Sequence, residues 1–171
     1  GIVIVGLGPA GANNLTREAW DWLSQVNEIW ARTRYHPVIS ELHENLIIHS
    51  FDSEEMNSSG DFGADIAKNL IRLCQEQGGV TYVVPGSPFI AEETVRQIMK
   101  GVEETQIPVR VIDGMSFLEP VCSALGLDPH PKLVLTDSLY LASLEIHFFP
   151  ASVPAMISNL RSGLEASDLK L

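Results

Sequence analysis

The residues with the clearest chemical potential lie in three short loops, each directly after a predicted strand. The loops read Gly6-Leu7-Gly8-Pro9-Ala10-Gly11, Pro85-Gly86-Ser87-Pro88-Phe89-Ile90 and Asp113-Gly114-Met115-Ser116-Phe117. Glycine and proline fix the path of the backbone, so that amides and carbonyls face outward at the strand ends. Ligands of open parallel sheets bind beyond the carboxyl ends of the strands. The three loops therefore predict a binding site for a small polar ligand.

The first loop satisfies Gly-x-Gly-x-x-Gly, which is the fingerprint of dinucleotide-binding folds. In those folds a helix begins at once and an acidic residue ends the second strand. Here Thr16 is the better helix N-cap, and the second strand runs into Arg32-Thr33-Arg34 without a carboxylate. Arg32 or Arg34 could instead bind a 2′-phosphate. An NADP- or FAD-binding oxidoreductase is thus one alternative, and a tight glycine turn without a ligand is another.

The second and third loops also have purely structural interpretations. Ser87 can serve as a local cap in a stiff turn between a strand and a helix. Ser116 followed by Glu119 is a capping box, which explains the serine without any ligand. A cap nevertheless leaves backbone amides at the helix amino end, where a ligand's polar edge could meet them.

Residues for acid or base chemistry are sparse in this sequence. No paired carboxylates, Cys/His pair or Ser/His/Asp spacing stands out, and the histidines lack metal-ligand spacing. His36 and Tyr35, just past the second predicted strand, are the nearest candidates for a general base. The alternative is that both lie in a solvated loop.

The elements that must position the loops follow from the hydrophobic pattern. Short β-branched runs alternate with segments of helical periodicity, which is typical of βαβ units around a buried parallel sheet. The predicted strands are 2–5, 28–31, 46–49, 81–84 and 109–112. A helix between the last two of these begins at Glu92 and Glu93 and ends before Gly101. The sequence predicts an α/β fold with an open, mostly parallel sheet and helices on both faces.

The predicted organisation is an amino-terminal α/β domain, residues 1–113, followed by a second, smaller α/β domain that begins in residues 114–171. The second part has a helix after residue 114, a strand at 133–135 and a helix from Ser152 with Pro154 in its first turn. The chain opens directly in a strand, and residues 167–171 resemble the start of another. We therefore expect a piece of a longer protein, with the second domain truncated.

Composition narrows the classes of partner. The 171 residues carry a net charge of −11, which repels nucleic-acid phosphates at long range. Cys74 and Cys122 share no close spacing and lie in apolar stretches, as reduced core residues of a cytoplasmic protein do. No run approaches the roughly 18 apolar residues of a membrane span. We expect a cytoplasmic protein without nucleic-acid or membrane partners.

Taken together, the three loops in this order and spacing resemble the tetrapyrrole (corrin/porphyrin) methylase family over the whole chain. They match that family's glycine-proline signature with the following Leu15-Thr16, its Gly-Asp-Pro loop, and its link into the second domain. The sequence is more closely similar to the amino-terminal domain of bacterial proteins that fuse such a methylase domain to a MazG-type nucleoside triphosphate pyrophosphohydrolase. The residues that carry this closer similarity are 32–37, 84–88 with 91–95, and 114–118.

The resemblance implies two α/β domains, a homodimer, and S-adenosylmethionine as the cofactor, with no metal. It implies cofactor contacts from all three loops, through Pro9, Gly86, Ser87, Pro88, Ile90, Ser116 and Phe117. Two positions depart from the family. Ser87 replaces the usual Asp, which removes a carboxylate that could accept hydrogen bonds from the cofactor, and Ala10 precedes the last glycine of the first loop. Further family contacts would lie at or beyond Leu171.

These expectations favour an S-adenosylmethionine-dependent methyltransferase whose methyl acceptor is not identified. Displacement at the sulfonium methyl requires alignment more than acid or base, which fits the loops. The acidic balance weighs against a polycarboxylate tetrapyrrole, although Arg32 and Arg34 could hold one carboxylate edge. Ser87 and the lack of a base motivate the alternative, a non-catalytic ligand-binding or docking module attached to a pyrophosphohydrolase.

Overall fold

The computed structural model describes residues 1–52, 62–143, 152–160, 162, 163 and 167. The chain separates into two compact units, residues 1–121 and 122–171. The domain boundary predicted after residue 113 stays a prediction. Elements with the label η are 3-10 helices, and the first unit contains β1 (Ile2–Gly6), η1 (Ala12–Asn14), α1 (Arg17–Leu23), β2 (Glu28–Ala31), η2 (Pro37–Glu41), β3 (Ile47–Ser50), α3 (Phe62–Gln77), β4 (Val80–Val84), α4 (Glu93–Val102) and β5 (Val109–Ile112). Helix α5 (Leu118–Leu125) spans the division, and β6 (Val134–Asp137), α6 (Ser138–Ala142) and β7 (Ala155–Ser158) follow.

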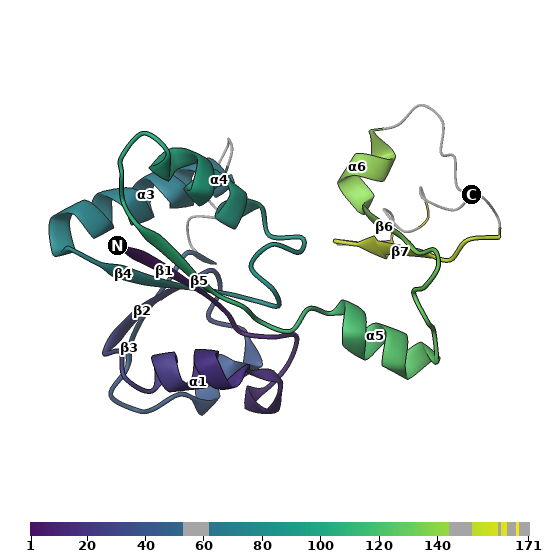
Figure 1. Ribbon diagram of the computed structural model, residues 1–171, viewed down its shortest axis with the longest axis horizontal. Helices are drawn as coiled ribbons and strands as arrows, with labels where there is room; N and C mark the ends of the chain where they lie inside the picture. Colours follow the sequence, from purple (N-terminus) through teal and green to yellow (C-terminus); the bar gives the residue numbers. More distant parts are fainter. Residues whose placement is uncertain (53–61, 144–151, 161, 164–166, 168–171) are drawn as a thin grey trace. The chain divides into compact units, whose positions relative to one another are not determined.

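The first unit is built on a five-stranded sheet in the order β3-β2-β4-β1-β5, in which every neighbouring pair is parallel (Figure 1). Strand β4 lies at the centre, and all five of its residues are buried. Val5 of β1 pairs with Val83 of β4 on one side and with Ile112 of β5 on the other. The carboxyl ends of β1, β4 and β5 therefore lie at one level, and the three loops that follow them start side by side.

Helices cover both faces of this sheet, as the sequence predicts. Ile2 and Ile4 of β1 belong to a core with α3 and α4, whereas Val5 belongs to a second core with α1. Figure 1 shows α3 and α4 on one face of the sheet and α1 on the other. The two cores follow from the alternation of side chains along each strand. The predicted fold class, α/β with an open parallel sheet, is confirmed.

The carboxyl end of α4 differs from the prediction. Helix α4 continues through Gly101 to Val102, although the sequence predicts a stop before the glycine. A Cβ on Gly101 would lie 2.6 Å from Cδ1 of Ile71, so this glycine lets α4 approach α3 closely. None of the helices in the described ranges is long and apolar enough to cross a membrane.

The second unit corrects another prediction. The helix expected from Ser152 is wrong, because residues 155–158 form β7, which pairs in parallel with β6. The carbonyl oxygen of Pro154 accepts a hydrogen bond from the Val134 N–H, at 3.0 Å. A proline is compatible with the position before a strand as well as with the first turn of a helix, and pairing with β6 satisfies the backbone groups of the segment.

Candidate functional site

The first and second loops are hydrogen-bonded to each other through two glycines. The Gly8 N–H donates to the carbonyl oxygen of Gly86 at 3.2 Å, and the Gly86 N–H donates to the carbonyl oxygen of Gly8 at 2.8 Å. Both glycines have positive φ, +73° at Gly8 and +66° at Gly86. L residues with a side chain rarely adopt this conformation, so glycine is strongly favoured at both positions.

Gly6 and Gly114 complete this contact. A Cβ added to Gly114 would lie 2.2 Å from the carbonyl oxygen of Gly86 and 2.8 Å from Cα of Gly6. The three loops therefore touch through their backbones, with no room for a side chain between them. A Cβ added to Gly86 would meet nothing within 4 Å, so this glycine borders open space. We call Gly6, Gly8, Gly86 and Gly114 the glycine junction.

Further hydrogen bonds fix the first loop to the third. The Thr16 hydroxyl donates to the carbonyl oxygen of Asp113 at 3.0 Å and accepts a backbone N–H of α1, which it caps as predicted. The Asn14 amide nitrogen lies 3.7 Å from the sulfur of Met115. The 3-10 helix η1 separates Gly11 from α1, so no α-helix begins at the third glycine of the motif. This arrangement differs from the dinucleotide fingerprint, as the sequence predicts.

The third loop begins α5 with the predicted capping box. Ser116 is buried, its hydroxyl donates to Oε2 of Glu119 at 2.5 Å, and its oxygen accepts the Leu118 N–H at 3.0 Å. The hydroxyl bond from Ser116 lowers the pKa of Glu119, and backbone N–H groups add to the effect. The hydroxyl proton of Ser116 is thus committed to Glu119. An oxygen lone pair and the backbone of the loop are what this residue can offer a ligand.

The second loop is a tight turn with one strained residue. The Ile90 N–H donates to the carbonyl oxygen of Ser87 at 3.2 Å, and Pro88 between them is buried. Ala91 follows with a φ of +58°. A left-handed conformation at a non-glycine residue is uncommon, and such strain is found near functional sites.

A buried side-chain network holds the far end of this loop. The Tyr82 hydroxyl lies 2.9 Å from Oγ1 of Thr94, which in turn donates to Oε1 of Glu92 at 2.5 Å. The same carboxylate oxygen caps α4 by accepting the Thr94 N–H at 3.1 Å. Burial raises the pKa of Tyr82 well above its ordinary value, and the negative charge of Glu92 adds to the effect. The second loop is therefore anchored both to β4 and to the start of α4.

The predicted cofactor contacts all lie on the three loops around the glycine junction. Pro9 is half-buried directly after Gly8, and the third loop carries Ser116 and the half-buried Phe117 close after Gly114. The second loop contributes Gly86, Ser87, Pro88 and Ile90. The role of each residue as a cofactor contact stays a prediction. Within the described ranges, no group of three or more His, Cys, Asp or Glu residues could hold a metal ion.

His36 is buried, with 8% of its surface exposed, and does not lie in a solvated loop. Its Nε2 lies 2.9 Å from the carbonyl oxygen of Gly8, which can only accept, so Nε2 carries the proton. Its Nδ1 accepts the Val38 N–H at 3.4 Å and caps η2. Both ring nitrogens therefore bind the backbone, and neither is free to take a proton from a substrate. Tyr35, the other candidate base, is 80% exposed.

The environment of His36 predicts a pH-dependent stability. Burial lowers the pKa of His36 below its ordinary 6.5, and the hydrogen bond to Gly8 opposes this in part. On acidification the unfolded chain therefore takes up this proton before the folded chain does. The contribution of neutral His36 to the free energy of unfolding is complete above the pKa that this histidine has in the unfolded chain. It is lost as the pH falls below that pKa. Between about pH 7.5 and about pH 5.5, we expect the melting temperature of wild type to fall more than that of His36→Gln. Equal falls in the two proteins would contradict this assignment.

The two arginines that follow the second predicted strand, Arg32 and Arg34, already contact other residues of the chain. The guanidinium of Arg32 lies 4.5 Å from the centre of the Phe62 ring. Arg34 donates through Nε to the Ser50 hydroxyl at 3.2 Å, and its backbone N–H donates to Oδ2 of Asp52 at 2.9 Å. A carboxylate beside Arg34 disfavours a second anion there, which weakens the NADP alternative.

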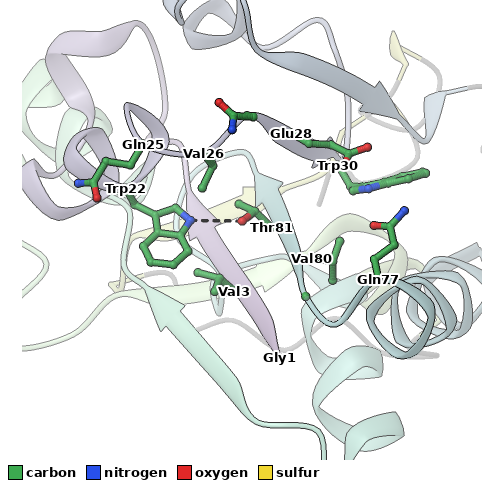
Figure 2. A pocket seen from close by; sticks show the side chains of 12 residues that line it. Gly1, Val3, Trp22, Gln25, Val26, Glu28, Trp30, Gln77, Val80 and Thr81 are labelled. Atoms are coloured by element: carbon green, nitrogen blue, oxygen red, sulfur yellow. Dashed lines mark hydrogen bonds between the residues drawn. The ribbon is translucent and has the colours of Figure 1, made fainter.

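A cavity of about 470 Å³ lies at the opposite edge of the sheet, among residues that open β1, β2 and β4 (Figure 2). Figure 2 shows the indoles of Trp22 and Trp30 on two sides of it, with Nε1 of Trp22 donating to the Thr81 hydroxyl at 3.3 Å. No residue of the three loops lines this cavity. It is separate from the candidate site.

Comparison with known proteins gives the loops a context. A sequence model of the family described as Tetrapyrrole (Corrin/Porphyrin) Methylases matches residues 1–144. The chain belongs to the tetrapyrrole methylase family. This tetrapyrrole methylase chain is 29% identical over 173 residues to the uncharacterized protein YabN of Bacillus subtilis (strain 168), covering 99% of this chain and 35% of that protein. The chain thus spans about a third of this curated relative.

Solved structures share the fold of this tetrapyrrole methylase chain. Uroporphyrin-III-C-methyltransferase from Thermus thermophilus is 20% identical, with a TM-score of 0.64 over 85% of this chain and 63% of that one. The structure of this enzyme complexed with S-adenyl homocysteine is 16% identical, with a TM-score of 0.55 over 80% of this chain and 55% of that one. Diphthine synthase is 18% identical, with a TM-score of 0.57 over 81% of this chain and 55% of that one. At these identities the likeness shows the fold alone.

Sequence reasoning missed two features of this tetrapyrrole methylase site. The sequence predicts a role for Gly6 and Gly114 only within their own loops and not their contact with Gly86, and it indicates His36 only as a candidate base. The available signal was a glycine within two residues of the end of each of β1, β4 and β5. The bond from His36 to Gly8 joins residues 28 positions apart and leaves no local pattern.

Proposed function

We propose that this chain forms the amino-terminal part of an S-adenosylmethionine-dependent methyltransferase. The observation that carries the proposal is the glycine junction, where three loops at the carboxyl edge of the sheet meet in a chain that belongs to the tetrapyrrole methylase family. The solved complex of the Thermus thermophilus enzyme with S-adenyl homocysteine supports the choice of cofactor.

The junction fits such a cofactor in two respects. Gly6, Gly8 and Gly114 pack against backbone atoms of the protein, whereas Gly86 borders open space, so that a ligand can approach its main chain closely. The loops are also held in place before any ligand arrives, by the Gly8–Gly86 pair and by the bond from Thr16 to Asp113. A preorganised site loses less entropy on binding.

In this proposal the chain aligns the reactants and does little acid or base chemistry. S-adenosylmethionine, when bound, supplies an electrophilic methyl group on a sulfonium sulfur. Holding that methyl in line with a nucleophile can contribute a large part of the rate acceleration. The residues that would hold the cofactor are Pro9, Gly86, Ser87, Pro88, Ile90, Ser116 and Phe117. The structure offers no candidate for a base among them, so the acceptor would have to be nucleophilic already.

A second candidate function is a ligand-binding module without catalysis. Ser87 stands where the family has Asp, and both nitrogens of His36 bind the backbone.

For the whole protein, we propose a linked MazG-type nucleoside triphosphate pyrophosphohydrolase, a homodimer and a cytoplasmic location. The share of YabN that this chain covers, 35%, supports the presence of a further domain.

Calorimetric titration of the full-length protein with S-adenosylmethionine, S-adenosylhomocysteine and NADP tests the proposal. We expect heat of binding from the first two and none from NADP. Binding of NADP alone would overturn it in favour of an oxidoreductase. A screen of methyl acceptors with labelled cofactor then separates the two candidates, because transfer of label identifies an enzyme, whereas binding without transfer to any acceptor favours the module.

A further inference from the structure

The 3-10 helix η2 holds the first loop at two points. His36, which caps the start of η2, donates through Nε2–H to the carbonyl oxygen of Gly8 at 2.9 Å. Glu41, the last residue of η2, accepts the Ala12 N–H through Oε1 at 3.0 Å. Neither residue belongs to the three loops. A segment that follows β2 therefore supports the loop that follows β1.

The carbonyl oxygen of Gly8 is shared between two donors. It accepts Nε2–H of His36 at 2.9 Å and the N–H of Gly86 at 2.8 Å. Both lone pairs of this oxygen are thus used, and three segments of the chain meet at one atom. His36 is shielded from water, which strengthens its hydrogen bond relative to an exposed one.

We propose that His36 is a positioning residue, which holds Gly8 against Gly86 and so sets the affinity of the first two loops for the cofactor. The inference rests on the proposed function as far as the cofactor is concerned. Gly8 has a positive φ of +73°. Without the hydrogen bond from His36, the backbone at this glycine could adopt many other conformations. His36 fixes the one in which the Gly8–Gly86 pair forms.

Two substitutions separate this role from the capping of η2. In His36→Gln the amide nitrogen can replace Nε2 as the donor to Gly8. In His36→Asn the shorter side chain can still accept the Val38 N–H as an N-cap but cannot reach Gly8. His43→Asn is the control, since Nε2 of the exposed His43 lies 3.1 Å from the carbonyl oxygen of Val26, away from the loops.

The experiment measures two quantities on the full-length protein and its variants. Calorimetry gives the affinity for S-adenosylhomocysteine, and hydrogen exchange followed by mass spectrometry gives the protection of residues 6–14 and 84–90. We expect His36→Asn to weaken binding about fivefold to tenfold, the loss of one shielded hydrogen bond. Both segments should also exchange faster in this variant. His36→Gln and His43→Asn should stay within about twofold of wild type in affinity.

The outcomes separate this inference from the proposed function. If wild type does not bind S-adenosylhomocysteine, the proposed function fails, and hydrogen exchange alone decides whether His36 positions the loops. If wild type binds, equal affinity and exchange in His36→Asn and wild type would overturn the inference. Equal losses in His36→Gln and His36→Asn would also overturn it, because the donor to Gly8 would then not be what matters.

Discussion

Replacement of Gly114 by Ala is expected to weaken the binding of S-adenosylhomocysteine strongly. The new Cβ would lie 2.2 Å from the carbonyl oxygen of Gly86 and 2.8 Å from Cα of Gly6. Both neighbours are backbone, so no side chain can turn aside and the loops themselves must separate. Overpacking of this kind costs typically about 1–3 kcal/mol, and displacement of two binding loops adds to the loss of affinity. We expect affinity to fall by at least about a hundredfold, which corresponds to about 2.7 kcal/mol.

Gly79→Ala is the matched control for this substitution. A Cβ on Gly79 would lie 3.6 Å from the carbonyl oxygen of Gly1, an ordinary contact, at the opposite edge of the sheet. Affinity within about twofold of wild type is expected for it, since nothing must move. Urea denaturation of both variants shows whether the chain still folds. A folded Gly114→Ala that binds S-adenosylhomocysteine as tightly as wild type would contradict the assignment of the junction as the site.

The largest loss of stability is expected for Phe51→Ala. Phe51 is fully buried directly after β3, and its ring centre lies 5.6 Å from that of Trp30 and 6.0 Å from that of Tyr82. Removal of the ring leaves a cavity in the core under α3, which costs about 3–5 kcal/mol. The net stability of a domain is about 5–15 kcal/mol, so this variant should lose a large share of it.

Urea denaturation followed by tryptophan fluorescence measures this effect, because Trp30 lies next to the altered site. Phe89→Ala makes the same substitution at a ring that is 55% exposed and should change the free energy of unfolding by less than about 1 kcal/mol. A loss below about 1 kcal/mol in Phe51→Ala as well would show that the ring does not pack as described.

The sheet could be predicted because its information is local. Runs such as residues 2–5 and 81–84 consist of β-branched and aromatic residues that must be buried on both faces, and this pattern appears in few other structures. Caps are equally local, so Thr16 before α1 and Ser116 with Glu119 could be identified from their spacing.

Features that depend on distant residues could not be predicted. Strand β7 exists because it pairs with β6, some twenty residues earlier, and the local pattern around Pro154 fits a helix start equally well. Phe51 lies beyond the predicted strand at 46–49, and it is buried in a core with residues distant in sequence, Tyr82 among them. The residue type and position of His36 fit a general base, and only its hydrogen bond to Gly8 shows that it supports the backbone.

The strand order of the first unit has a consequence for the order in which the site can assemble. Strand β1 leaves the ribosome before the other four strands of its sheet, yet its neighbours are β4 and β5, residues 80–84 and 109–112. A hydrophobic segment must therefore wait for more than half of the chain before it is paired on both sides. Contacts so distant in sequence form slowly, and the unpaired strand is exposed to aggregation meanwhile. The glycine junction needs all three of these strands and can close only after β5 has joined the sheet.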